Sequence, residues 1–346
     1  SNTAQFFFFF FSFQNLTIGG RKRDGSDATN EVSYLCLEAS VKVKTHQPGL
    51  SVRIHPNCPP EFMMAVCKLI SCGTGFPAVH NDRAGYEMLL AAGLEPEDAR
   101  DWSNCGCVVP HFRKIGEWTS AANINLAAAM EFTMGNGIHR LSGEKLGLDS
   151  DLAEAATYED FKKLFLQQVS HLIRVAVTGS LVCQRVHAEI VPRPYLSMLV
   201  DGCMEKGKDL SKGGAKYCLA PVLTGIGLAD AANALAAIKK LVFEENKYKL
   251  SDFVAAMDAD WVGYEKMRKD VLACPKYGND DDYVDSITSD LSDFYHHEIH
   301  QYTDLFGAPF NSAFMGISNY IPAGSVVGAT PEGRKAGTPL TEGVSP

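Results

Sequence analysis

The chain has 346 residues, 46% of them hydrophobic, and it carries 32 basic and 41 acidic residues for a formal net charge of -9. Such a chain can bury the core of one large or two ordinary domains. The negative charge argues against a nucleic-acid surface, because phosphate binding requires Lys and Arg gathered on one face, so small molecules or proteins are the expected partners.

The N-terminal third predicts short strands that alternate with helices. A polar turn over 19–29 precedes a helix over 30–43, and an apolar stretch over 50–54 predicts a strand. A second helix over 60–71 begins with proline, which the first helical turn tolerates. A strand or loop is expected over 76–80.

The middle of the chain contains a stretch that cannot be helical. Two short helical segments, over 86–92 and 95–101, lead into 103–110, which is too rich in Gly, Cys and Pro for a helix. Long helices are expected afterwards over 121–134, which is rich in alanine, and over 153–181.

The alternation of elements predicts an α/β fold rather than a helical bundle. A further helix is expected over 229–239, and short apolar strands near Leu50, Phe76, Val108 and Phe310 lie between the helices. No repeat or linker marks a boundary, so residues 1–346 are predicted to be one piece of a single catalytic domain.

The two ends and the cysteines add weaker expectations. The phenylalanine run over 6–11 predicts a buried segment, and an N-terminal Ser together with the loop-like end at 344–346 predicts a piece of a longer protein. The ten cysteines are scattered, and no secretory signal or apolar run of about 18 residues is present, so reduced thiols in the cytoplasm are expected.

Three motifs favour ordinary structural interpretations. Gly225-Ile226-Gly227 is typical of a helix start, because Asp230 stands where a dinucleotide loop has its third glycine. The 296–300 stretch has His296 and His300 one turn apart but lacks the glutamate of a zinc protease, so it predicts a surface or interdomain cluster. The 280–282 aspartates predict a solvated turn and no calcium loop.

The stretch Cys105-Gly106-Cys107-Val108-Val109-Pro110 carries the strongest functional signal. No second Cys or His pair has zinc-like spacing, so the metal interpretation is weak and no metal is expected. Glycine beside cysteine in a short strand-like loop, followed by proline, indicates a thiol presented at the tip of a turn.

With its surroundings this stretch resembles the glycyl radical enzymes, the pyruvate formate-lyase-like superfamily. Ordered matching stretches lie at 13–20, 24–31, 50–53, 106–108, 328–337 and 344–346. The resemblance implies a fragment of a ten-stranded α/β barrel, rich in helices, in which Cys107 forms the thiyl radical. It also implies a glycyl radical, installed by a radical S-adenosylmethionine activating enzyme, and a homodimer of catalytic subunits.

Two departures from the family refine this expectation. The Arg-Val-x-Gly-Tyr or Phe loop that bears the radical does not occur here, so this chain alone is expected to be inactive and its C-terminal radical domain to lie outside it. Family eliminases and decarboxylases typically carry Glu two residues after the cysteine, where this chain has Val109. Valine cannot move the proton that elimination requires.

An apolar wall beside Cys107 suits a hydrocarbon, and the residues after it resemble the alkylsuccinate synthases, relatives of benzylsuccinate synthase. The preferred prediction is therefore addition of an n-alkane across the double bond of fumarate, with accessory small subunits as further partners. Arg113, Lys114 and Arg53 are the candidates for holding the fumarate carboxylates. The alternatives are a family eliminase or decarboxylase with a relocated base, and a barrel protein without catalysis.

Overall fold

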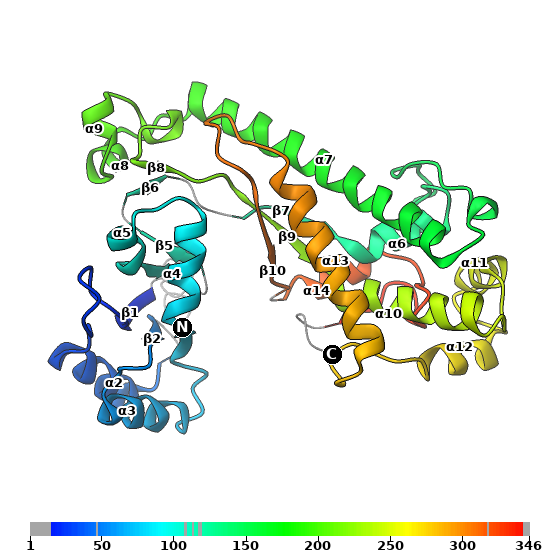
Figure 1. Ribbon diagram of the computed structural model, residues 1–346, viewed down its shortest axis with the longest axis horizontal. Helices are drawn as coiled ribbons and strands as arrows, with labels where there is room; N and C mark the ends of the chain where they lie inside the picture. Colours follow the sequence, from blue (N-terminus) through cyan, green and yellow to red (C-terminus); the bar gives the residue numbers. More distant parts are fainter. Residues whose placement is uncertain are drawn as a thin grey trace, which may run out of the picture. The chain divides into compact units, whose positions relative to one another are not determined.

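The computed structural model describes residues 15–45, 48–106, 109–112, 114–116, 120–316 and 318–341. The predicted burial of the phenylalanine run concerns residues outside these ranges. The described chain falls into two compact units, Ser1–Gly116 with Arg193–Cys218 and Glu117–Pro192 with Leu219–Pro346. Figure 1 shows both, coloured along the chain. The single catalytic domain stays a prediction, because compact units need not fold separately.

The first unit is built on a parallel sheet of three strands in the order β1-β2-β3. The strands are β1 (Asn15–Gly19), β2 (Gly49–Ile54) and β3 (Ala78–Asn81), and the helices that connect them are α2 (Glu31–Val43) and α3 (Pro60–Ile70). Figure 1 shows α2 and α3 side by side below β1 and β2. Their shared core comprises Ile18, Leu37, Leu50, Val52, Phe62, Val66 and Leu69.

Local sequence signals explain why these helices begin where they do. The Asn30 side chain accepts the backbone N–H groups of Val32 and Ser33, and the Ser33 hydroxyl accepts the Asn30 backbone N–H, which closes a capping box. Proline occupies the first position of α3. The helices predicted over 30–43 and 60–71 and the strand over 50–54 are confirmed.

The remaining elements of the first unit are short. They are α4 (Asp82–Ala91), α5 (Pro96–Arg100), β4 (Ser103–Cys105), β5 (Val109–His111), β6 (Ile115–Gly116), α8 (Pro194–Leu199), α9 (Cys203–Lys206), η2 (Leu210–Lys212) and β8 (Tyr217–Cys218). Strands β4 and β5 form an antiparallel hairpin, whereas β6 and β8 pair in parallel. The non-helical character predicted for 103–110 is confirmed for its described residues.

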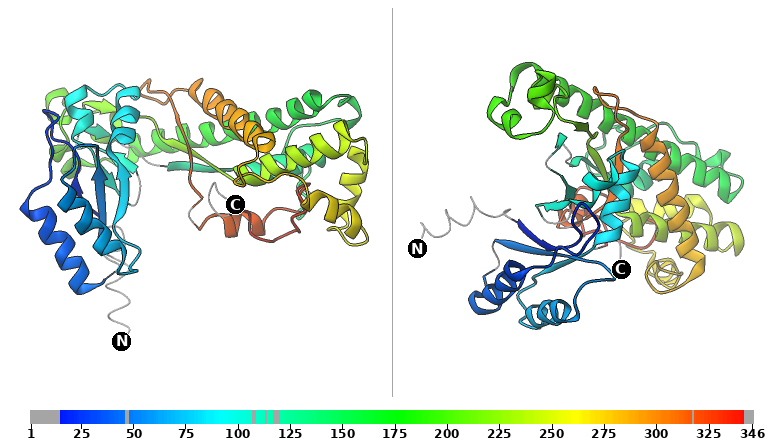
Figure 2. Two further views of the ribbon diagram at one scale, coloured as in Figure 1. Left: turned by 60° about the horizontal axis from the view of Figure 1, so that its bottom comes forward. Right: turned by 60° about the vertical axis from the view of Figure 1, so that its left-hand side comes forward.

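The second unit holds another parallel sheet, in the order β10-β9-β7. Its strands are β7 (Ser120–Asn125), β9 (Val222–Ile226) and β10 (Asn311–Phe314). Its helical elements are α6 (Leu126–Met134), η1 (Leu152–Glu154), α7 (Tyr158–Ile190), α10 (Leu228–Ile238), the π-helical η3 (Lys239–Glu244), α11 (Leu250–Asp258), α12 (Glu265–Leu272), α13 (Asp282–His300) and α14 (Tyr320–Ser325). Figure 2 shows these elements from two further directions.

Two predicted helices have different boundaries in the structure. The helix predicted over 121–134 begins only at Leu126, because the preceding residues form β7 and pair with β9. Alanine favours helix, but pairing in the sheet overrides this local preference. The helix predicted over 153–181 begins at Tyr158, where Thr157 and Asp160 form a capping box, and continues to Ile190.

Gly227 separates β9 from α10, which confirms the predicted helix start. Its φ of +80° lies in the left-handed region, and a Cβ there would lie 3.1 Å from Leu340. Glycine is favoured at such a position because it has no side chain to clash. In the described ranges no helix combines the length and hydropathy needed to cross a membrane. The cysteines described there are free thiols.

Candidate active site

The β4–β5 hairpin consists of the residues on either side of positions 107 and 108. Cys105 pairs with Val109 across the two strands, and Gly106 begins the turn with a φ of +64°, a conformation that glycine adopts without strain. Cys107 and Val108 follow Gly106 directly but lie outside the described residues. The described residues before and after positions 107 and 108 are thus paired as two antiparallel strands. The role of Cys107 stays a prediction.

One face of the hairpin brings Val109 and His111 together. Residues opposite one another in an antiparallel pair share a face, and Ser103 stands opposite His111. Ser103 is exposed, and Val109 and His111 are half-buried. Burial lowers the pKa of His111, so the imidazole is neutral near pH 7. Sequence analysis missed His111, although the two-residue period of a strand places it on the face of Val109.

A pocket of about 730 Å³ adjoins the base of the hairpin. Its lining mixes apolar residues with charged and polar ones, among them Lys22, Asp24, Asp101, Ser103 and Phe112. Charged and polar groups of both signs suit a polar molecule better than a hydrocarbon. Val109 does not line this pocket, so the apolar wall predicted beside Cys107 stays a prediction.

Arg53 also borders this pocket, but its guanidinium is committed to the protein. Its Nε donates to Asp82 Oδ1 at 2.8 Å, and its Nη atoms donate to Asp82 and to the carbonyl oxygens of Arg100 and Trp102. Its side chain is 5% exposed and stacks over the Trp102 ring at 4.5 Å. Burial lowers the pKa of Arg53, and Asp82 opposes that effect. These contacts make Arg53 an anchor between β2 and the residues before β4.

Lys114 belongs to a second anchor, around the buried carboxylate of Asp98. Lys114 Nζ lies 3.1 and 3.3 Å from the two Asp98 oxygens. Asp98 also accepts from Lys216 and Tyr217, both at 2.8 Å, and pairs with Arg23 at 2.7 Å. This cluster ties the segment after the hairpin to α5 and β8. Arg113, the third predicted fumarate ligand, lies outside the described residues.

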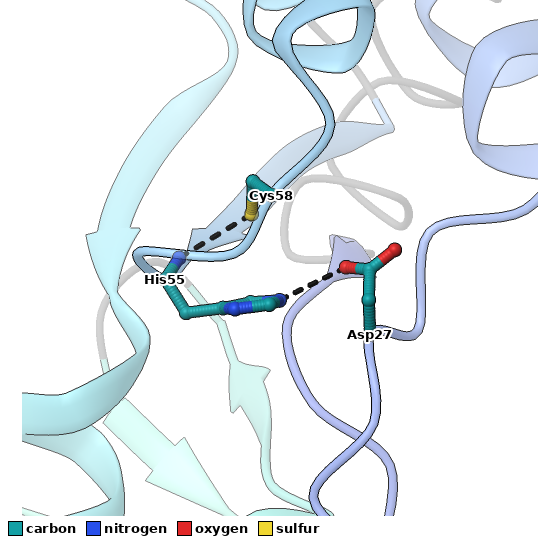
Figure 3. A group of neighbouring side chains, drawn as sticks. All are labelled: Asp27, His55 and Cys58. Atoms are coloured by element: carbon teal, nitrogen blue, oxygen red, sulfur yellow. Dashed lines mark hydrogen bonds and ion pairs between the residues drawn. The ribbon is translucent and has the colours of Figure 1, made fainter.

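Asp27, His55 and Cys58 form a cluster with ligand atoms within 4.8 Å of one another (Figure 3). His55 Nε2 donates to Asp27 Oδ1 at 2.9 Å, and its Nδ1 accepts the Asn57 backbone N–H at 3.3 Å. This tautomer leaves no ring lone pair for a metal. Burial raises the pKa of Cys58, which keeps the thiol protonated, so the cluster is a hydrogen-bonded brace.

The second unit holds two buried carboxylates, Glu332 in the 328–337 stretch and Asp230 in α10, that were not predicted as site residues. Glu332 is buried and accepts the Thr330 hydroxyl at 2.6 Å. Burial, and then the charge of Asp230, raises the pKa of Glu332 to about 7. Burial also raises the pKa of Asp230, whose oxygens accept the Thr341 backbone N–H at 3.0 and 3.1 Å. Through these hydrogen bonds to Thr330 and Thr341, the two carboxyl groups stabilise the conformation of the 327–341 segment.

Comparison with known families supports the predicted fold. The family model described as "Pyruvate formate lyase-like" matches residues 1–324. The glycerol-bound structure of the B12-independent glycerol dehydratase from Clostridium butyricum superimposes with a TM-score of 0.91 at 37% identity. That match covers 95% of this chain and 42% of the dehydratase chain. The helix-rich α/β fold expected for a barrel fragment is confirmed.

Two curated relatives have names that describe elimination reactions. Trans-4-hydroxy-L-proline dehydratase of Clostridioides difficile is 33% identical over 336 residues, which cover 96% of this chain and 42% of the relative. Isethionate sulfite-lyase of Desulfovibrio desulfuricans is 32% identical over 351 residues, which cover 95% and 40%. The chain thus spans about two fifths of the length of these relatives.

Proposed function

Because the chain belongs to the pyruvate formate lyase-like family of glycyl radical enzymes, we propose that the protein carrying it is a radical lyase that eliminates a leaving group from a small polar molecule. The observation that carries this proposal is the similarity to a dehydratase and a sulfite-lyase at 33% and 32% identity. The charged and polar residues in the pocket beside the β4–β5 hairpin support a polar substrate.

This proposal changes the preferred substrate. Sequence analysis favoured addition of a hydrocarbon to fumarate and kept elimination as the alternative, and the relatives support that alternative better. Arg53 and Lys114 already hold Asp82 and Asp98, which weakens their assignment to fumarate carboxylates. Val109 and the resemblance of the residues after Cys107 to the alkylsuccinate synthases still favour an apolar substrate.

The chemistry assigns two tasks to the hairpin. The glycyl radical supplies the means to remove one hydrogen atom from Cys107. The sulfur of Cys107 then takes a hydrogen atom from a substrate carbon and returns it after the leaving group has departed, so the step is redox neutral. Loss of water also requires a proton to leave the hydroxyl beside the carbon radical and to reach the departing hydroxide.

His111 is the relocated proton carrier in this proposal. It shares a strand face with Val109, the position at which family eliminases typically carry Glu. A neutral imidazole can accept the proton and then donate it, which a valine cannot. Activation by a separate radical S-adenosylmethionine enzyme, homodimer formation, small accessory subunits and a cytoplasmic location remain predictions of the family resemblance.

The test compares substrates and variants in the activated full-length enzyme. Wild type is assayed with glycerol, trans-4-hydroxy-L-proline, isethionate, and hexane with fumarate, and products are identified by mass spectrometry. Turnover of a polar compound supports the proposal, whereas alkylsuccinate formation without it refutes elimination. His111→Gln is expected to lower kcat by about 10² to 10⁴ while the glycyl radical signal persists.

Two further variants distinguish a catalytic role of His111 from a structural one. His80→Gln is the matched control, because His80 is also half-buried with a pKa lowered by burial, and its kcat is expected to stay within twofold of wild type. Adding Val109→Glu to His111→Gln is expected to restore part of kcat, because it supplies a carboxylate at the position where the family resemblance places Glu in eliminases. Equal losses at His80 and His111 would assign His111 a merely structural role.

A further inference from the structure

Helix α13 carries His296 and His300 one turn apart, in the stretch that sequence analysis interpreted as a surface or interdomain cluster. Their ring centroids lie 4.0 Å apart at an interplanar angle of 42°. His296 is exposed and His300 is half-buried in the described chain. Two histidines four residues apart on one helix can place both imidazoles on a single metal ion.

Hydrogen bonds at Nδ1 orient both rings. His300 Nδ1 lies 3.1 Å from the His296 carbonyl oxygen, which only accepts, so this nitrogen carries the proton and Nε2 keeps its lone pair. His296 Nδ1 lies 3.0 Å from the Ser312 hydroxyl of β10, whose oxygen can accept a hydrogen bond from the Nδ1–H group in the same way. Metal-ligating histidines are generally held through the other ring nitrogen in this manner.

The helix beneath the pair is fixed by its buried side. Tyr295 and Ile299 are fully buried, and the Tyr295 hydroxyl donates to the Leu223 carbonyl oxygen of β9 at 3.2 Å. The two imidazoles therefore project from a rigid turn beside the sheet. A preorganised pair loses little conformational entropy on binding.

Charge at the pair also favours the unprotonated state that a metal requires. Burial, followed by the proximity of His300 and His297, lowers the pKa of His296, and the Asp293 carboxylate opposes that effect. A neutral imidazole is the form that binds metals. The contrast with His55 is informative, because there Nε2 is occupied by Asp27 and the Nδ1 lone pair by a backbone N–H.

We propose that His296 and His300 form a chelate site for a divalent first-row transition metal ion, which both Nε2 atoms bind while water completes the coordination. Among the ions with high affinity for imidazole, Ni²⁺ and Cu²⁺ are the suitable probes. The inference is independent of the proposed lyase function, since the site needs neither a substrate nor the radical.

The experiment titrates the 346-residue chain with Ni²⁺ by calorimetry at pH 7.5. His296→Gln and His300→Gln are each expected to weaken the tightest Ni²⁺ binding at least tenfold. His187→Gln, an exposed histidine on α7, is the matched control and is expected to leave affinity within twofold. The accessible thiols of every variant are first alkylated with N-ethylmaleimide, because free thiols bind Ni²⁺ and reduce Cu²⁺.

A second measurement needs no variant. Cu²⁺ bound at one equivalent to the wild-type chain is expected to show coupling to two imidazole nitrogens in its electron paramagnetic resonance spectrum. Unchanged Ni²⁺ affinity in both glutamine variants, loss in only one of them, or a Cu²⁺ spectrum without coupling to two imidazole nitrogens would each overturn the proposal. Circular dichroism without metal identifies any variant that fails to fold, and the Cu²⁺ spectrum then decides.

Discussion

Replacing Asp98 with asparagine is expected to destabilise the first unit by about 2 to 3 kcal/mol. The carboxylate is 2% exposed. It forms ion pairs with Lys114, Lys216 and Arg23 and accepts a hydrogen bond from the Tyr217 hydroxyl. It is the point at which α5, β8 and the segment after the β4–β5 hairpin meet. Its loss therefore affects the support of the hairpin as well as stability.

The magnitude follows from the exposure of its partners. Removing one member of a buried ion pair costs about 3 to 5 kcal/mol, because the other charge is left without compensation. Lys114 is 14% exposed and fits that case, whereas Lys216 and Arg23 are 43% and 39% exposed and can turn to water. The amide oxygen of asparagine also keeps one hydrogen bond. The expected loss of stability is therefore about 2 to 3 kcal/mol, below the range for a fully buried pair.

The pH dependence has a definite sign. Burial raises the pKa of Asp98, but hydrogen bonds from Lys216, Tyr217, Lys114 and Arg23 outweigh burial and hold it well below the ordinary value of 3.8. The stabilisation is therefore complete above that value and is lost as pH falls below it. The difference between wild type and Asp98→Asn should be constant from about pH 5 to 8 and shrink below about pH 4.

Hydrogen exchange measured by mass spectrometry during urea titration, on peptides from 96–116 and 210–218, reports the first unit directly. Asp201→Asn is the matched control, since Asp201 lies 4.0 Å from Lys114 but is 45% exposed. It is expected to change stability by less than about 0.5 kcal/mol. Equal small effects of both variants, or a difference that grows in acid, would refute the reasoning.

Two further predictions concern the hairpin and the buried acids. Cys107→Ser in the activated full-length enzyme should keep the glycyl radical signal and abolish product, while Cys105→Ser keeps activity; the reverse pattern would assign the radical role to Cys105. Glu332 has a pKa raised from 4.5 to about 7 by burial and Asp230, so its contribution to stability is present below pH 4.5 and is lost as pH rises through 7. Glu332→Gln should flatten that pH dependence, measured by hydrogen exchange of the 327–341 segment, and an unchanged slope would contradict the assignment.

The sequence alone determined the features that depend on neighbouring residues. Helix α2 begins after Asn30 because that side chain accepts backbone N–H groups two and three positions later. Proline sets the start of α3, and Gly227 supplies the left-handed turn before α10. The ordered landmarks also determined the family, because they are matches of residues and need no coordinates.

Only the tertiary structure decided features that join distant parts of the chain. Residues 121–125 read as helix from alanine content, but β9, about 100 residues later, pairs with them as a strand. The sequence presents Arg53 and Lys114 as candidate substrate ligands, and only the structure shows that they contact the carboxylates of Asp82 and Asp98. The physical reason is that ion pairs and strand pairing depend on distance in space, which local propensity and residue spacing do not encode.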